Sequence, residues 1–429
     1  MSDVFYSFGN NVLSVSGGYL GSTNNPPVLP AKTIRVEIEA GKTLTFKSGT
    51  NVTQTQVSSS PNVWDIYCSS TAWNGLLGYG SFGKLEGSTY ILKVIAANMS
   101  GVRYADHLLY DQPNLTEVNL SNTGSVTEFT STFYHCTDLT TVNLFDTGAC
   151  TDFGGMFEGC TSLETVPLFD MSSANNLGAM FRGCSSLTSV PLFDLSHVTR
   201  TYYMFSSCSS LTTVPLFDTR NVTDMEGTFY GCSSLTTVPV FNTSSCITFN
   251  ALFEYCTSLE NPPLLDTSHA TNLNYMFYGC SSLTTVPFYN TSNATSTNYM
   301  FGQSGITTIP QLNTSKVTTM TGMFNSCNNL ISIPIIDTNK VTNMESMFWA
   351  CQNLQTVPLL DTSSVTDVNS MFRLCYKVES GALALYNQMS TQTVPPTSHP
   401  YCFGNCGSQT TTGAAELAQI PTSWGGTMS

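Results

Sequence analysis

The chain has 429 residues, with 28 Asp and Glu against 14 Lys and Arg, and charged residues make up only 10% of it. An acidic chain with so few cations is poorly suited to neutralise phosphates, which argues against nucleic-acid binding. No stretch of about 18 apolar residues occurs, which argues against insertion into a membrane.

The N-terminal segment, residues 1–32, is rich in Gly, Ser, Asn and Pro. It begins MSDVFYSFG, without the basic stretch and apolar core of a secretory signal peptide, so we expect no such signal. The run NNPPVLP would form a stiff hinge. We expect this segment to be an anchor or arm that becomes ordered on a partner.

Residues 33–86 carry the alternation of β-strands. TIRVEIEAGKTLTF alternates apolar and polar residues and turns at Ala-Gly-Lys, which is a hairpin signal. NVWDIYC adds another strand-like run. These patterns predict a small β region that caps the segment following it.

From residue 87 to residue 378 the chain repeats itself every 24 residues, in about twelve coils. Ser304 replaces the recurring cysteine once, and a one-residue contraction follows it. An aromatic residue lies three positions before each of these sites, as Phe229 does before Cys232. The cysteine ladder consists of Cys136, Cys160, Cys184, Cys208, Cys232, Cys256, Cys280, Cys327, Cys351 and Cys375.

Within one coil the apolar spacing changes. The run LTTVPLF, with Leu211 to Phe217, is short and apolar, as a buried strand would be, although its proline limits strand length. Val222, Met225 and Phe229 are three and four residues apart, which predicts a short helix. One coil cannot bury enough apolar surface to fold alone, so coils must stack. The predicted fold is an α/β solenoid of strand-plus-helix coils.

The last segment, residues 379–429, would close the solenoid. GALALYNQM is helix-like, and a Pro-rich loop and AAELAQI follow it. We expect a C-terminal cap, because an open coil exposes an edge for unwanted pairing. Cys402 and Cys406, in YCFGNCG, are candidates for a disulfide.

Two repeated residues invite chemical interpretations. The cysteine ladder has no metal-ligand spacing, and neighbour pairing would leave odd thiols, so buried reduced thiols are expected. A row of Asp or Asn, one per coil, could hold calcium or form Asx turns that cap the following helix. We favour the Asx turns, because Asn serves equally at three positions. This Asx ladder consists of Asp146, Asp170, Asp194, Asp218, Asn242, Asp266, Asn290, Asn313, Asp337 and Asp361.

The repeat MFxxCxxLxxVPxxDTSxVTxM resembles that of BspA-like leucine-rich-repeat surface proteins, over about two thirds of the chain. The resemblance implies a leucine-rich-repeat-like solenoid used in adhesion or surface recognition, with no catalytic residues to transfer. The start, MSDVFYSFG, is similar to gut-phage members of that group.

Aromatic residues outside the core positions are the candidate ligand contacts. Flat rings beside Asn-rich positions suit sugars, because ring faces contact C–H groups while amides bind hydroxyls. The alternatives are contacts with another subunit or virion protein, and packing of the coil edges. The candidate residues are Tyr203, Tyr230, Tyr275, Tyr278, Tyr299 and Trp349.

These observations predict a non-enzymatic phage virion surface protein: a head fibre, decoration or tail-associated adhesin. It would attach to virion proteins through residues 1–32 and bind a host-surface glycan or protein. A bacterial cell-surface adhesin is the first alternative, and a polysaccharide-degrading tail spike is the second. By analogy with fibres it would be a homotrimer. No cofactor or metal is expected.

Overall fold

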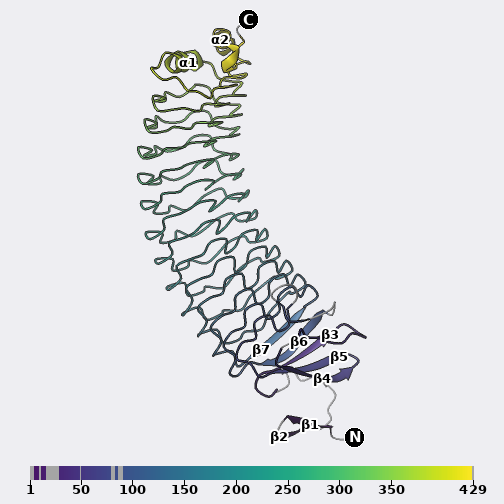
Figure 1. The fold of residues 1–429 in the computed structure, drawn as a ribbon. Helices are drawn as coiled ribbons and strands as arrows, with labels where there is room; N and C mark the ends of the chain where they lie inside the picture. Colours follow the sequence, from purple (N-terminus) through teal and green to yellow (C-terminus); the bar gives the residue numbers. More distant parts are fainter. Residues whose placement is uncertain are drawn as a thin grey trace.

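A computed structural model describes residues 4–8, 11–15, 29–48, 50–78, 83–85 and 90–427. Figure 1 shows a curved rod with a small β-sheet at one end and two helices at the other. The rod confirms the predicted solenoid. The predicted arm, residues 1–32, lies largely outside the described residues. Within it, β1 (Val4–Phe8) pairs with β2 (Asn11–Val15) as an antiparallel hairpin.

The sheet at the N-terminal end has the order β4-β5-β3-β6-β7. Its strands are β3 (Thr33–Ile38), β4 (Val52–Ser59), β5 (Asn62–Cys68), β6 (Ile91–Asn98) and β7 (Glu117–Ser121). The predicted strand NVWDIYC is confirmed as β5. The hairpin predicted within TIRVEIEAGKTLTF is wrong, because β5 and β6 occupy both edges of β3. The parallel β6–β7 pair joins this sheet directly to the stacked coils.

Each coil contains a spiral of tight turns where the apolar spacing predicted a helix. The N–H of Gly155 donates to the carbonyl of Gly178 in the next coil at 2.9 Å, whereas the N–H of Glu158 donates back to the Gly155 carbonyl at 3.1 Å. Gly155 and Gly159 have φ values of 60° and 76°. In an α-helix, each N–H beyond the first turn donates to the carbonyl four residues before it, and every residue has right-handed backbone angles. The helix prediction is therefore wrong, although its apolar side chains are buried.

The proline-containing stretch is also not a strand. Instead the chain makes a tight turn at each of these prolines. The N–H groups of Phe169, Phe193 and Phe217 each donate to the carbonyl of the proline two residues before, at 2.9–3.0 Å. Proline has no N–H for a ladder. Asn119 occupies the equivalent position in β7, and there a paired strand forms.

The core is a column of stacked phenylalanines. Phe229, for example, has its ring centroid 5.8 Å from Phe205 and 5.7 Å from Phe253, with interplanar angles of 9° and 7°. The column runs through Phe133, Phe157, Phe181, Phe205, Phe229, Phe253, Phe277, Phe301, Phe324, Phe348, Phe372 and Phe403. Stacked offset rings contribute beyond the apolar area that they bury.

Each thiol of the cysteine ladder is buried and reduced, as predicted. Cys208 Sγ donates to the carbonyl of Phe181 in the preceding coil at 3.1 Å, and the other ladder thiols make the equivalent contact. Burial raises the pKa of the Cys208 thiol well above its usual range. At Ser304 the shorter hydroxyl bonds instead to Phe301 of its own coil, at 2.6 Å. Cysteine therefore supplies both packing and a donor between coils.

The solenoid extends beyond both predicted bounds. Parallel bridges link successive coils from Ala72, inside the predicted β region, to Ser398. In this last coil Cys402 takes the position of the usual methionine, Phe403 continues the ring column, and Cys406 extends the cysteine ladder. Both thiols are buried and free, so this structure does not contain the candidate disulfide.

The C-terminal segment closes this end of the rod. Helix α1 (Ala382–Ser390) confirms the helix predicted in GALALYNQM, and α2 (Thr411–Leu417) and a short 3₁₀ turn (Thr422–Trp424) follow. In the described part of the chain, no helix has the length and apolar content to cross a membrane.

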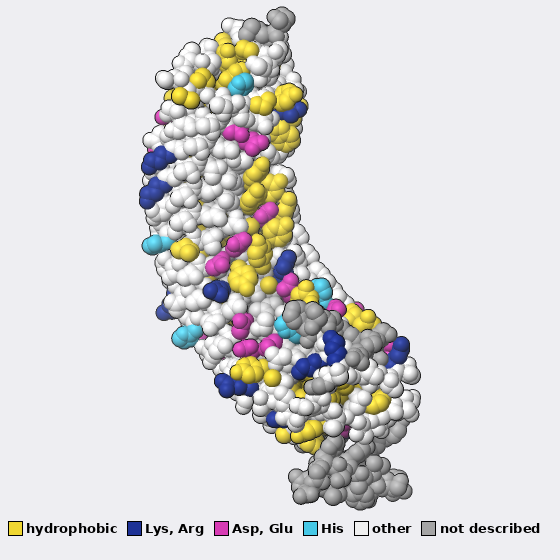
Figure 2. Space-filling model, in the orientation of Figure 1, with side chains coloured by type: hydrophobic (Ala, Val, Ile, Leu, Met, Phe, Trp, Pro, Cys, Tyr) yellow, Lys and Arg dark blue, Asp and Glu magenta, His cyan; other side chains and the backbone are white. Residues whose placement is uncertain are grey.

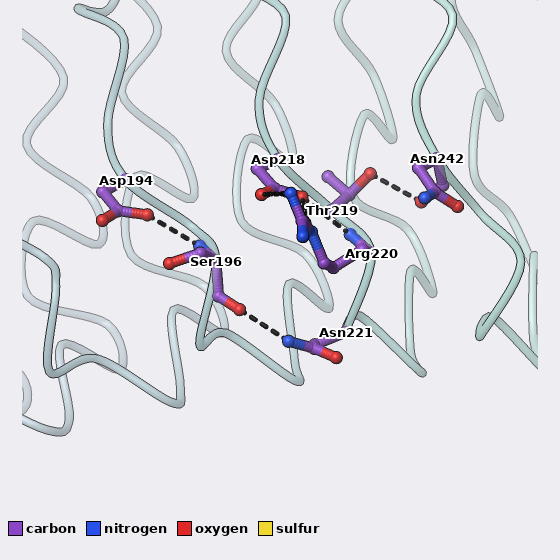
Figure 3. Close-up of polar contacts among 7 residues, drawn as sticks. All are labelled: Asp194, Ser196, Asp218, Thr219, Arg220, Asn221 and Asn242. Atoms are coloured by element: carbon purple, nitrogen blue, oxygen red, sulfur yellow. Dashed lines mark hydrogen bonds and ion pairs between the residues drawn. The ribbon is translucent and has the colours of Figure 1, made fainter.

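The Asx ladder makes the predicted turns (Figure 3). Asp194 Oδ1 accepts the N–H of Ser196 at 2.9 Å, and each of the ten ladder residues accepts the N–H two residues on. The threonine that follows a ladder residue often links coils, as Thr219 Oγ1 donates to the Asn242 carbonyl at 2.8 Å. These turns cap a turn spiral, where a helix had been expected. Among the described residues, no three His, Cys, Asp or Glu side chains are grouped to hold a metal ion.

Candidate functional site

The surface of the rod is poor in charge. Figure 2 shows a face that is mostly uncharged and polar, with hydrophobic side chains gathered along one edge and charged side chains scattered over it. Two sets of exposed side chains are distinct from the rest of the surface. One is a patch of tyrosines, partly predicted from the sequence, and the other is a row of apolar residues that the sequence prediction had placed in the core.

The tyrosine patch consists of Tyr230, Tyr255, Tyr275, Tyr278 and Tyr299. Tyr275 stacks on Tyr299 with centroids 5.2 Å apart and an angle of 8°. Tyr278 meets both of these rings edge-on, at 5.7 and 6.0 Å. Tyr255 meets Tyr278 and Tyr230 edge-on at 5.4 and 5.9 Å. The coils therefore bring three predicted residues into direct contact, and Tyr255, which the prediction had missed, links Tyr230 to them.

Three of these tyrosines lie in left-handed backbone conformations. The φ values of Tyr255, Tyr275 and Tyr299 are 59°, 56° and 53°. Bulky residues are rare in this region, because the Cβ approaches the backbone, whereas glycine is free of that strain. Gly227 and Gly322 occupy the slot of Tyr275 and Tyr299 in other coils, with φ values of 55° and 58°. Large rings are thus held in the patch where the backbone favours glycine.

The rings also pack on glycines of the following coil. A Cβ built on Gly279 would lie 2.5 Å from the Tyr255 ring, and one on Gly322 would lie 2.3 Å from the Tyr299 ring. The coil-edge packing that was an alternative to ligand contact is therefore present. The opposite ring faces and edges remain partly exposed, since all five side chains are half-buried or exposed.

Polar groups lie within the patch. Gln303 Nε2 donates a hydrogen bond to the hydroxyl of Tyr278. Glu254 fills the slot of Tyr230 and Tyr278 in the coil between them. Burial raises the pKa of Tyr230, Tyr275 and Tyr278, and the Glu254 charge adds a smaller effect in the same direction. Its own half-buried position raises the pKa of the Glu254 carboxyl from 4.5 to about 7. Neither Glu254 nor Gln303 was predicted from the sequence, because their slots show no fixed residue type.

Glu254 gives the fold a specific pH dependence. The pKa of Glu254 is about 7 in the folded protein, above the ordinary 4.5, so protonation of Glu254 favours folding. This contribution to the free energy of unfolding is complete below pH 4.5 and is lost as the pH rises through about 7. We expect the free energy of unfolding of wild type relative to Glu254→Gln to fall by about 1–2 kcal/mol from pH 5 to pH 8, after allowance for solvent screening. Urea unfolding of both proteins across this range checks it, and parallel pH curves would contradict it.

Two predicted residues lie outside the patch. Tyr203 is three coils before Tyr275, where its hydroxyl donates to Glu226 Oε1 at 3.1 Å and the Arg182 guanidinium lies 5.8 Å from its ring. Trp349 occupies the slot of Tyr278 three coils further along. In the described part of the chain, no ring contact joins Tyr203 or Trp349 to the tyrosine patch.

The sequence prediction was also wrong for the residue that follows each proline. Leu216, expected inside a strand, is 61% exposed, and its equivalents in other coils are 56–72% exposed. The following phenylalanine turns inward, so the apolar run has one buried and one exposed face. We call this row the apolar ridge; it consists of Leu144, Leu168, Leu192, Leu216, Val240, Leu264, Phe288, Ile335 and Leu359.

Three solved structures are similar in part. A leucine-rich cell surface protein from Faecalibacterium prausnitzii is 22% identical, with a TM-score of 0.45, over 71% of this chain and 94% of that one. A leucine-rich-repeat protein from Eubacterium ventriosum is 18% identical, with a TM-score of 0.38, over 63% and 80%. One from T. pallidum is 23% identical, with a TM-score of 0.29, over 46% and 82%. These TM-scores are too low to support an inference about function.

No curated protein matches the chain. A family model described as "Mycoplasma protein of unknown function, DUF285" matches residues 103–216, 209–309 and 284–384. These stretches lie on the stacked coils and together span more than half of the chain. The protein therefore belongs to the DUF285 family.

Proposed function

We propose that this protein is a non-enzymatic bacterial cell-surface adhesin that binds carbohydrate at the tyrosine patch. The observation that carries the proposal is the clustering of five partly exposed tyrosine rings on successive coils. The description of the family as a Mycoplasma protein favours a bacterial protein over a virion protein.

The chemistry of the patch suits a sugar. The C–H groups of a pyranose pack on exposed tyrosine faces, while its hydroxyls need donors and acceptors at the rim. Tyr278, Gln303 and Glu254 supply these groups beside the rings. The polysaccharide-degrading spike and the virion protein stay predictions.

A glycan array carrying mucin O-glycans and microbial polysaccharides tests the proposal. We expect Tyr275→Gly/Tyr299→Gly to lose at least about tenfold in affinity for the glycans that wild type binds, since each stacked ring contributes on the order of 1 kcal/mol. Glycine is the native residue of this slot in other coils, so the unfolding midpoint should stay within a few degrees of wild type.

Tyr203→Gly is the matched control. It removes the same ring from the same slot with a similar φ of 52°, but outside the patch, and should bind like wild type. Equal glycan binding by the double variant and wild type would refute the proposed site. Shortening of a polysaccharide during incubation would show that the protein is an enzyme.

A further inference from the structure

The apolar ridge is a second surface, on different slots from the tyrosine patch. Its nine residues occupy the same position of ten successive coils, with Gln311 in the remaining place, and each is 56–72% exposed. At a spacing of about 4.8 Å per coil, the ridge is roughly 45 Å long. Soluble monomers rarely expose continuous apolar patches of more than a few hundred Å².

The size of the ridge matches that of a stable interface. A half-exposed Leu, Ile or Phe side chain presents about 100 Å² of apolar surface, so nine present roughly 900 Å². A standard protein–protein interface buries about 800 Å² on each partner. The ridge therefore has the area that one stable partner of similar length would cover.

A second copy of the chain has the spacing that such a partner needs. Its own ridge repeats at the same rise, so side chains of two ridges can interdigitate in register where the two curved rods touch. The spaces between successive side chains of the ridge accommodate this packing. One hollow of about 500 Å³ is lined by Phe288, Gln311 and Ile335, and another of about 390 Å³ by Val240 and Leu264.

Charge restricts how two copies can pair. The Asx ladder follows the ridge two residues on, and most of its members are exposed. Hydrogen bonds from Ser172 and Ser196 lower the pKa of Asp170 and of Asp194, so these carboxylates are ionised at neutral pH. A two-fold axis parallel to the rod places the two Asx ladders at opposite edges of the interface. An axis across the rod would bring them together, which is unfavourable.

We propose that the apolar ridge joins two copies of the chain side by side, in parallel, as a homodimer. This arrangement places both N-terminal ends on the same side of the assembly. It differs from the homotrimer expected by analogy with fibres, and it does not depend on carbohydrate binding by the tyrosine patch.

Sedimentation equilibrium of the full chain at about 10 μM tests the proposal. Wild type should have twice the chain mass of 46.5 kDa. Leu192→Ser/Leu216→Ser/Val240→Ser should raise the dissociation constant at least about 100-fold and sediment at the chain mass. Leu216→Ser alone should raise the dissociation constant of the dimer about tenfold. This single variant replaces the triple variant in the test if the triple variant unfolds.

Ile247→Ser is the matched control, because Ile247 is 54% exposed but lies outside the ridge, and it should leave the dimer intact. The dimer should also tighten from about 0.05 to about 0.5 M NaCl, since salt screens repulsion between two acidic chains. A wild type that stays at the chain mass at about 100 μM would overturn the proposal. So would a monomer that binds a Leu/Lys amphipathic peptide through the ridge, because the partner would then be cationic.

Discussion

Replacing Phe229 by alanine is expected to lower the free energy of unfolding by about 3–5 kcal/mol. The Phe229 side chain is 3% exposed and stacks on a ring above and a ring below. Its removal therefore leaves a cavity lined by two other rings of the column and interrupts the contact between neighbouring coils. Urea unfolding followed by circular dichroism measures the change.

Ile247→Ala is the control for this prediction. It also truncates an apolar side chain, but one that is 54% exposed and lies outside the apolar ridge, and should cost less than about 0.5 kcal/mol. In a solenoid each coil contacts only its neighbours, so a weakened junction can also separate unfolding into two steps. Equal effects of the two substitutions would contradict the assignment of Phe229 to the core and Ile247 to the surface.

Deleting one full coil should be tolerated, whereas deleting half a coil should prevent folding. Removal of residues 209–232 joins Cys208 to Ser233, so the ring column, the cysteine ladder and the Asx ladder all continue in register. Removal of residues 209–220 instead joins the cysteine turn directly to the turn spiral, and the inward side chains of this coil then face the wrong neighbours.

The two deletions should differ in the free energy of unfolding by nearly its whole value. The 24-residue deletion should unfold cooperatively with a slightly smaller denaturant dependence, because less surface is exposed on unfolding. The 12-residue deletion should give a largely unfolded or aggregated protein, as judged by circular dichroism and sedimentation. A well-folded 12-residue deletion would mean that the repeat is not the structural unit.

The sequence was sufficient to predict the register of the coils. The 24-residue period placed the rings and thiols correctly, because identical buried slots must stack on one another. The period also continues into YCFGNC, where Cys402, Phe403 and Cys406 fill the methionine, phenylalanine and cysteine slots. That signal was readable, but the longer insertion before it, with α1, hid the repeat.

The local structure was harder to predict. Residues three and four apart point inward both in a helix and in the observed turn spiral, so the apolar spacing of Val222, Met225 and Phe229 cannot distinguish them. The difference comes from bonds to the next coil, such as that from Gly155 to Gly178, which are long-range. Small residues at left-handed positions were the available sign against a helix.

The candidate site was predicted in part for the same reason. The shared slots of Tyr275 and Tyr299, and of Tyr230 and Tyr278, were visible in the repeat. The position of Tyr255 beside them depends on which way a left-handed residue directs its side chain. Likewise, Leu216 and Phe217 are equally apolar in the sequence, and the turn closed by the proline carbonyl decides which of the two is buried.

Binding by two in-register coil deletions tests the central claim most directly, namely that a modular scaffold carries carbohydrate binding on one patch. Deletion of residues 161–184 removes a coil outside the tyrosine patch, and deletion of residues 257–280 removes Tyr275 and Tyr278. On the same glycan array, the first should bind like wild type and the second should lose binding, with both proteins folded. Equal binding by the two folded deletions, or loss of binding in both, would contradict it.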